Sequence, residues 1–109
     1  MKYDLTKYGH VARQAMAENR KNDEHYTWTI KAINKNSIKF NWSYLSKHEE
    51  FVLTVRESAE EPYVLIEFPH GLSKVCFLIG EASWCDAKTL EVGIYKSIIY
   101  AADKAKRMF

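Results

Sequence analysis

The sequence is poor in the residues that mark special architectures. Among its 109 residues are two cysteines, two prolines and four glycines. Two cysteines are too few for a disulfide framework, and no apolar run reaches the roughly 18 residues of a transmembrane helix. The N-terminal MKYDLTKYGH also lacks the apolar segment of a signal peptide. We therefore expect a cytoplasmic protein with reduced thiols and no membrane contact.

Motifs of metal binding and catalysis are equally scarce. There is no C-x-x-C, H-x3-H or H-E-x-x-H pattern, and no glycine-rich phosphate loop. The four histidines are scattered along the chain, outside any nucleophile or base motif. The glutamate pairs at 49–50 and 60–61 are expected in solvated turns and not as an acid/base pair. The sequence therefore predicts no metal, no cofactor and no enzymatic activity.

Cys85 is the one residue that invites a catalytic interpretation. Ser83 and Asp86 have the spacing of a capping box, which predicts a helix from Trp84 and puts Cys85 in its first turn. A thiol there can have a lowered pKa. A nucleophile also needs a base, however, and His70 is expected in a turn at the opposite end of the preceding strand. We therefore interpret Cys85 as a packing residue.

The residues that are present predict a folded globular chain, with 47% hydrophobic and 14% aromatic residues. Apolar residues recur every three or four positions over 5–21, which predicts a helix with Asp4 as its N-cap. Residues 26–32 and 38–44 alternate with period two around the turn-forming NKNS, which predicts a β-hairpin. A third strand is expected around residues 51–55.

Residues 63–68 and 74–79 are expected to be the fourth and fifth strands. Their sequences, YVLIEF and KVCFLI, are apolar on both faces. Both faces should therefore be covered, by helices, by the curl of the sheet or by a partner. Cys76 is interpreted as a small core residue of the fifth strand, and the reducing compartment argues against a disulfide with Cys85.

The last segment is expected to be a long helix from Trp84 to the end of the chain. Gly93 in its middle would be explained by a close approach to the sheet. The predicted order is α-β-β-β-β-β-α. We therefore expect a single α+β domain over residues 1–109, with an antiparallel meander sheet and helices on one face.

The net charge of +2 is unevenly distributed. Residues 1–48 contain nine Lys/Arg and four Asp/Glu, whereas residues 49–109 contain seven and ten. Such an imbalance predicts a basic and an acidic side, which can steer the approach of a partner.

Aromatic and basic side chains occupy opposite faces of the predicted hairpin. A sheet that stacks nucleic-acid bases presents aromatic rings and cations on one open face. Here the rings alternate with the lysines, which favours an aromatic core beneath a polar face. The residues expected to meet a partner from that polar side are Lys31, Lys35, Lys39, Asn41 and Lys47.

These features predict a small non-enzymatic interaction protein that binds a protein target as a regulator or inhibitor. Immunity proteins and phage-encoded inhibitors of host defence, which are viral proteins, are comparable in size and in their lack of motifs. The alternative is a nucleic-acid-binding module using the basic N-terminal half, with Arg13, Arg20 and Lys21 on the first helix beside the hairpin lysines.

Self-association is a further expectation. Val92, Tyr95, Ile99 and Tyr100 widen the apolar side of the last helix beyond what one covered face requires. Exposed apolar patches usually mark interfaces. A homodimer, or a partner docked there, is therefore predicted.

Overall fold

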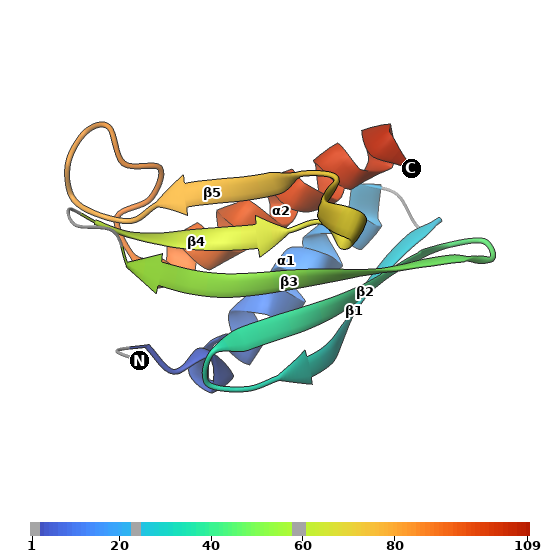
Figure 1. Ribbon diagram of the computed structural model, residues 1–109, viewed down its shortest axis with the longest axis horizontal. Coiled ribbons are helices and arrows are strands. Elements are labelled where there is room, and N and C mark those ends of the chain that lie inside the picture. Colours follow the sequence, from blue (N-terminus) through green and yellow to red (C-terminus); the bar gives the residue numbers. More distant parts are fainter. Residues whose placement is uncertain (1–2, 23–24, 58–60) are drawn as a thin grey trace.

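In the residues that the structure describes, the protein folds into one antiparallel sheet with two α-helices packed on one of its faces (Figure 1). The computed structural model describes residues 3–22, 25–57 and 61–109. Its elements are the 3-10 helix η1 (Leu5–Tyr8), α1 (Gly9–Asn22), β1 (Tyr26–Ile33), β2 (Ser37–Tyr44), β3 (Lys47–Glu57), β4 (Pro62–Glu67), the 3-10 turn η2 (Pro69–Gly71), β5 (Lys74–Leu78) and α2 (Leu90–Met108). The strand order β1-β2-β3-β4-β5 confirms the predicted α+β meander.

The N-terminal helix begins as its sequence predicts. Asp4 is the N-cap, and its carboxylate accepts a hydrogen bond from the backbone N–H of Thr6 at 3.0 Å. The first turn is 3-10, and the α-helix follows from Gly9. Leu5, Val11 and Ala15 are buried. The apolar stripe therefore packs α1 against the sheet and α2.

The aromatic core predicted for the hairpin is confirmed. Trp28 on β1 lies opposite Trp42 on β2, and both are buried. The alternation fails after Ile30, because a bulge there shifts the register of β1. Strict alternation over residues 26–32 puts Ala32 on the same face as Trp28, but Ala32 is exposed. Ile33 packs against the core in its place.

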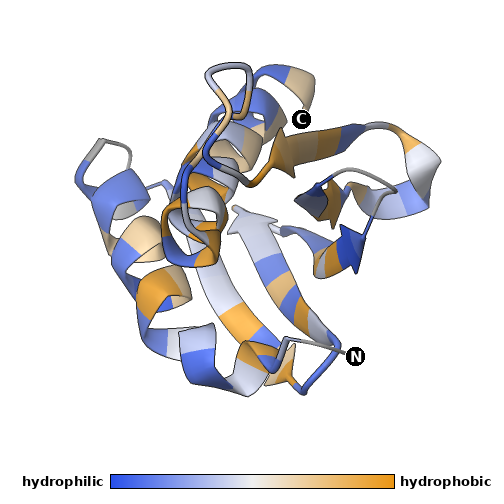
Figure 2. Cartoon of the chain, turned by 90° about the vertical axis from the view of Figure 1, so that its left-hand side faces the viewer, coloured by the Kyte–Doolittle hydropathy of each residue, from blue (hydrophilic) through white to orange (hydrophobic). Residues whose placement is uncertain are grey.

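The two helices lie side by side over the sheet, as the view along the molecule shows (Figure 2). α1 contacts β1 and α2, and α2 contacts β4 and β5. Gly93 is buried where α2 meets the sheet, and a Cβ there would collide with Cδ1 of Ile79. The close approach predicted for Gly93 is therefore present.

The predicted start of the last helix is wrong by six residues. α2 begins at Leu90, and the hydroxyl of Thr89 caps it by accepting from the backbone N–H of Val92 at 3.2 Å. Asp86 has another role, because its carboxylate accepts from the backbone N–H of Leu78 at 2.8 Å. Residues 80–89 thus fold back over the end of β5, which closes part of this sheet edge.

Two further predictions, the burial of Cys76 and the turn at Glu49 and Glu50, are wrong for different reasons. Cys76 is exposed and not a core residue, since β5 buries Val75 toward the helices and turns Cys76 to the other face. Glu49 and Glu50 lie within β3, because the hairpin turn is formed earlier, at residues 45–46. Glu60 lies outside the described residues.

Candidate interaction surface

The outer sheet face, meaning the side of the sheet opposite the helices, carries an apolar patch. Core-facing positions such as Leu53, Val64 and Val75 fix which side chains point outward, because neighbours along a strand alternate. The side chains of the patch come from β3, β4 and β5 and are those of Val52, Tyr63, Leu65, Cys76 and Leu78.

The register brings these side chains together. Leu65 lies directly between Thr54 on β3 and Cys76 on β5, and Tyr63 pairs with Leu78. Leu65 is only 8% exposed, although it is outside the helix-covered core. Its neighbours in the patch are half-buried or exposed. The patch therefore has a shielded centre and an accessible margin.

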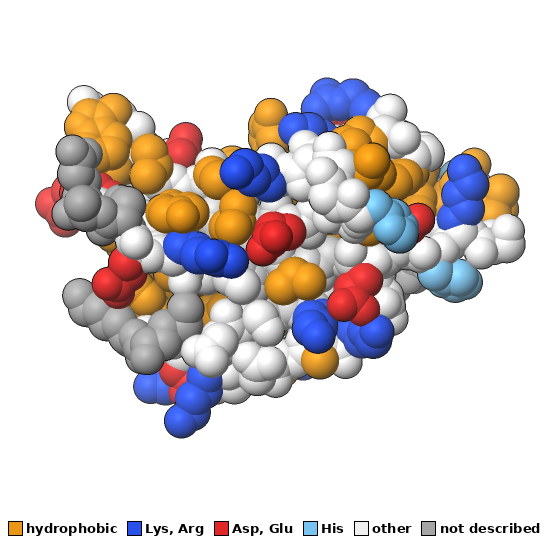
Figure 3. Space-filling model, viewed as in Figure 1, with side chains coloured by type: hydrophobic (Ala, Val, Ile, Leu, Met, Phe, Trp, Pro, Cys, Tyr) orange, Lys and Arg blue, Asp and Glu red, His pale blue; other side chains and the backbone are white. Residues whose placement is uncertain are grey.

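Figure 3 shows this face of the molecule. Hydrophobic side chains gather over β4, β5 and the loop that follows β5, while basic and acidic side chains alternate over the rest of the sheet. That loop includes Trp84, which is 56% exposed. In the described residues both helices lie on the opposite side (Figure 1), so no helix among them covers the patch.

Two ion pairs contribute charged side chains to the outer sheet face. Lys31 donates to Glu50 with 2.6 Å between Nζ and Oε2, and Arg56 lies 3.5 Å from the carboxylate of Glu67. The hydrogen bond from Lys31 lowers the pKa of Glu50, against a smaller opposing effect of desolvation. The Lys31–Glu50 pair lies on the β1 side of the patch. The Arg56–Glu67 pair runs across the boundary of β3 and β4 beside Leu65, because Arg56 is opposite Tyr63 and Glu67 is opposite Val52.

The structure brings together three of the five side chains predicted to meet a partner. Lys31, Lys39 and Asn41 lie on the outer face of β1 and β2. Lys35 lies in the β1–β2 turn, where its carbonyl accepts from the backbone N–H of Leu5. Lys47 is the first residue of β3 and pairs with Tyr44 at the other end of β2, a strand about 25 Å long. The last two therefore belong to different ends of the sheet.

The helix cations of the alternative set belong to α1, which packs beside β1. Arg13 is an exposed side chain of α1. Lys21 is also exposed and lies 3.6 Å from Glu18. The side chain of Arg20 is outside the described part of the structure. Lys21 and Lys31 are thus each paired with a carboxylate, which reduces the positive charge that a nucleic acid would meet.

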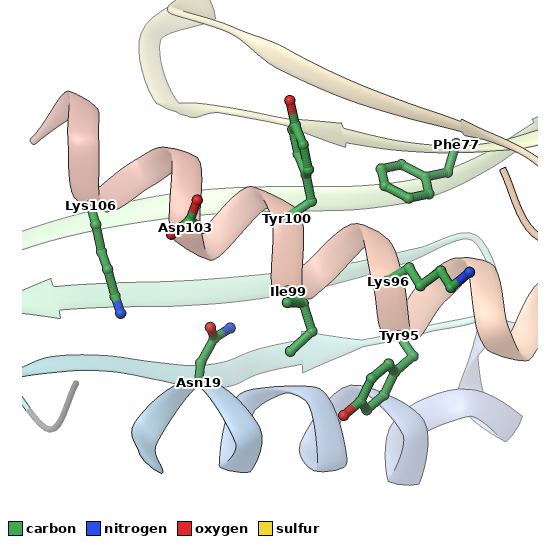
Figure 4. Close-up of a pocket in the computed structure, with 8 residues that line it drawn as sticks. All are labelled: Asn19, Phe77, Tyr95, Lys96, Ile99, Tyr100, Asp103 and Lys106. Carbon is green, nitrogen blue, oxygen red and sulfur yellow. The ribbon is translucent and has the colours of Figure 1, made fainter. Parts of the chain in front are cut away.

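A second feature lies on the helix side. A hollow of about 630 Å³, named here the α2 hollow, is lined by Asn19, Phe77, Tyr95, Lys96, Ile99, Tyr100, Asp103 and Lys106. Figure 4 shows Asn19 reaching from α1 toward α2 and Phe77 reaching from β5 toward Tyr100. The rings of Phe77 and Tyr100 meet edge to face, with centroids 5.9 Å apart. The hollow therefore has aromatic walls and a charged rim.

Asn19 and Phe77 were not among the predicted site residues. Asn19 follows Ala15 by four positions and Met16 by three, so it falls on the apolar stripe of α1. A polar residue on an apolar stripe is the sequence feature that could have identified Asn19 as a site residue. Phe77 carried no signal, because the sequence of β5 is apolar on both faces.

Cys85 is in the loop after β5 and not in a helix. Partial burial raises the pKa of its thiol, and the negative charge of Glu61 adds to this. His70 is at the opposite end of β5, where its Nε2 lies 3.3 Å from Glu49. The two groups are therefore separated by the length of the strand.

Residues 3–22, 25–57 and 61–109 contain neither a metal-binding cluster nor a membrane-spanning helix. No group of three or more His, Cys, Asp or Glu side chains there could hold a metal ion. No helix in this part of the chain is long and apolar enough to cross a bilayer.

Comparison with known proteins adds no relative. The chain matches no protein-family model, and neither the curated proteins nor the solved structures show a significant similarity to it.

Proposed function

We propose that this protein acts without catalysis, by binding a protein partner through its outer sheet face. The apolar patch over β3, β4 and β5 supports this most directly, because folding leaves it uncovered by either helix. Sheet positions that face water are usually polar. A regulator or inhibitor that covers part of its target needs such a surface and no reactive group.

The arrangement of side chains on this face resembles a protein interface. Such interfaces have an apolar centre and a polar rim that stays partly in water. Here Leu65 is at the centre, the Lys31–Glu50 pair is at the rim, and the Arg56–Glu67 pair runs beside Leu65 on the β3 side. Lys39 and Lys74 add exposed positive charge on two sides. A partner with an apolar centre and acidic margins is the best match.

The experiment compares one variant on each side of the molecule. Cys76→Glu puts a charge into the patch at an exposed position, and Tyr100→Glu puts the same charge on α2. The tagged wild type and both variants are used to capture proteins from native, nuclease-treated extract. We expect one protein to be captured by the wild type and by Tyr100→Glu but not by Cys76→Glu.

The affinity for the captured protein then gives the quantitative result. Cys76→Glu should weaken it at least about tenfold, since a charge is desolvated in an apolar contact. Equal affinity of wild type and Cys76→Glu would rule out the outer sheet face as the binding surface. Circular dichroism and the thermal midpoint show whether each variant is folded.

Binding to nucleic acid is the second candidate, favoured only by the basic N-terminal half. The pairing of Lys31 with Glu50 and of Lys21 with Glu18 argues against it, because phosphate binding needs neighbouring cations that are not already neutralised. Gel shifts with single-stranded and duplex probes at low salt test it. A shift that disappears steeply with salt would replace the protein-binding proposal.

A further inference from the structure

The outward side of α2 is more apolar than a solvent-facing helix surface should be. Val92 is 41% exposed and Tyr100 is 50% exposed, while Tyr95 and Ile99 are half-buried. The opposite side of the helix is already buried in the core, with Ile94, Ile98, Ala101 and Ala105 at 0% exposure. Tyr95 and Ile99 pack only partly against the core, and Tyr100 contacts Phe77, so all three leave apolar surface exposed in the walls of the α2 hollow.

The α2 hollow on this side also contains an unsatisfied donor. The Asn19 side-chain amide is buried, with 7% of the residue exposed, and its Nδ2 has no hydrogen-bond partner. Figure 4 shows this side chain directed toward α2, between Ile99 and Lys106. Buried amide groups are normally paired. The hollow is therefore a place where a bound protein could supply an acceptor oxygen.

The charges along α2 identify the occupant. Lys96 and Asp103 are exposed and lie two helical turns apart on the same side. The midpoint between them falls between Ile99 and Tyr100, about 5 Å along the axis from each. If two copies of α2 pack antiparallel about this midpoint, Lys96 of each copy faces Asp103 of the other. Such mutual pairing is characteristic of a two-fold interface.

We propose that a second copy of this chain packs on the outward side of α2, with the two helices antiparallel. The Ile99 and Tyr100 side chains of both copies form the centre of this interface. Two Lys96–Asp103 ion pairs flank it, and the α2 hollow receives aromatic side chains of the second copy. This surface is on the opposite side of the molecule from the outer sheet face, so the inference does not depend on the proposed function.

The size of the surface predicts a weak dimer. A 19-residue helix is about 28 Å long, and a contact strip about 10 Å wide would bury roughly 600 Å² in total. Stable interfaces usually bury 1,200 Å² or more. We therefore expect a dissociation constant between roughly 10 and 300 μM.

The test is a charge exchange across the interface, measured by sedimentation equilibrium at protein concentrations between roughly 10 and 500 μM. The mass of the wild type should rise from 12.8 kDa toward twice that value. Lys96→Glu and Asp103→Lys should each weaken association about tenfold or more, because each places like charges opposite one another. The double variant should return the dissociation constant to within about threefold of wild type.

Two further variants keep the result unambiguous. Tyr100→Glu should also abolish association, whereas Cys76→Glu on the other side should leave it unchanged. Thermal midpoints confirm that each variant is folded, including Asp103→Lys, which also removes a 3.3 Å contact with Arg107. A wild type that stays monomeric at 500 μM would overturn the proposal. So would a double variant that associates no better than the single ones.

Discussion

Cys85 shows how strongly a residue's chemistry depends on where the chain puts it. In the first turn of a helix its thiol would gain from the helix dipole. In the loop after β5 it is half-buried, its backbone N–H donates to the carbonyl of Ala82, and Glu61 acts on it through its negative charge. Burial and the nearby carboxylate both disfavour the thiolate. The pKa of this thiol is therefore raised, opposite to the direction that a catalytic cysteine needs.

The two cysteines should react at different rates with iodoacetamide. The thiolate is the reacting form, so the raised pKa of Cys85 means that less of it reacts near neutral pH. Cys76 is exposed on the outer sheet face and should be modified first. Brief alkylation of the folded protein at pH 7 and pH 9, followed by mass spectrometry of peptides, measures both sites.

Modification at Cys85 should increase strongly between these two pH values, because the thiolate fraction rises about tenfold per pH unit below the pKa. The Cys76→Ser variant isolates this reaction. Rapid labelling of Cys85 at pH 7 in that variant would contradict the raised pKa. Labelling of the unfolded chain gives the reference rate for each cysteine.

At the scale of elements, the sequence was sufficient for most helices and strands but not for the start of α2. Residues 83–86 and residue 89 both offer capping side chains. The choice between them depends on Leu78, whose backbone N–H is at the open edge of the sheet and is bonded by Asp86. A local sequence pattern does not show that Leu78 needs this acceptor, because the need arises from the position of β5 at the edge of the folded sheet. Thr89 is therefore the cap.

The strands also show where prediction from the sequence fails. Alternation placed Trp28, Phe40 and Trp42 correctly, because one face of the hairpin is apolar and the other polar. For β4 and β5 both faces are apolar, so the sequence did not specify which would meet the helices. Cys76 was misplaced for this reason. The uncovered side of the same strands is the candidate interaction surface.

Gly93 is where α2 and the sheet constrain one another, and Gly93→Ala tests the contact. The new methyl would meet Cδ1 of Ile79, and overpacking typically costs about 1–3 kcal/mol. Alanine regains about 1 kcal/mol of helix propensity. We expect the free energy of unfolding, measured in urea, to fall by about 1 kcal/mol.

Ile79→Val provides the matched background, since it removes the methyl group with which the new side chain would collide. There, Gly93→Ala should raise stability by up to about 1 kcal/mol relative to Ile79→Val alone. The interaction energy from the double-mutant cycle should be about 1–2 kcal/mol. The same cost of Gly93→Ala in both backgrounds would show that the Ile79 contact is not responsible.

At the scale of the whole molecule, the sheet separates two surfaces. The apolar patch is on one side, and the outward face of α2 is on the other. The sequence contained part of each, because the apolar excess of β4, β5 and α2 is visible in it. The positions of Val52 and Asn19 on these surfaces could not be predicted from the sequence, because they depend on strand register and helix packing.

This separation predicts that partner binding and self-association are independent if both proposals hold. Substitutions that are far apart and share no contacts usually have additive effects within about 0.5 kcal/mol. Lys96→Glu should therefore weaken self-association while leaving the affinity for the captured partner unchanged. Cys76→Glu should weaken partner binding while leaving self-association unchanged.

Calorimetric titration with the partner, at protein concentrations below and above the dissociation constant of the dimer, measures this independence. It should give one partner per chain in both conditions. A stoichiometry of one partner per two chains at high concentration would mean that the two surfaces compete. Dissociation of the dimer when the partner binds would mean the same. The partner would then extend around an edge of the sheet. The β5 edge is the expected position of that contact, because it lies between the patch and Phe77 of the α2 hollow.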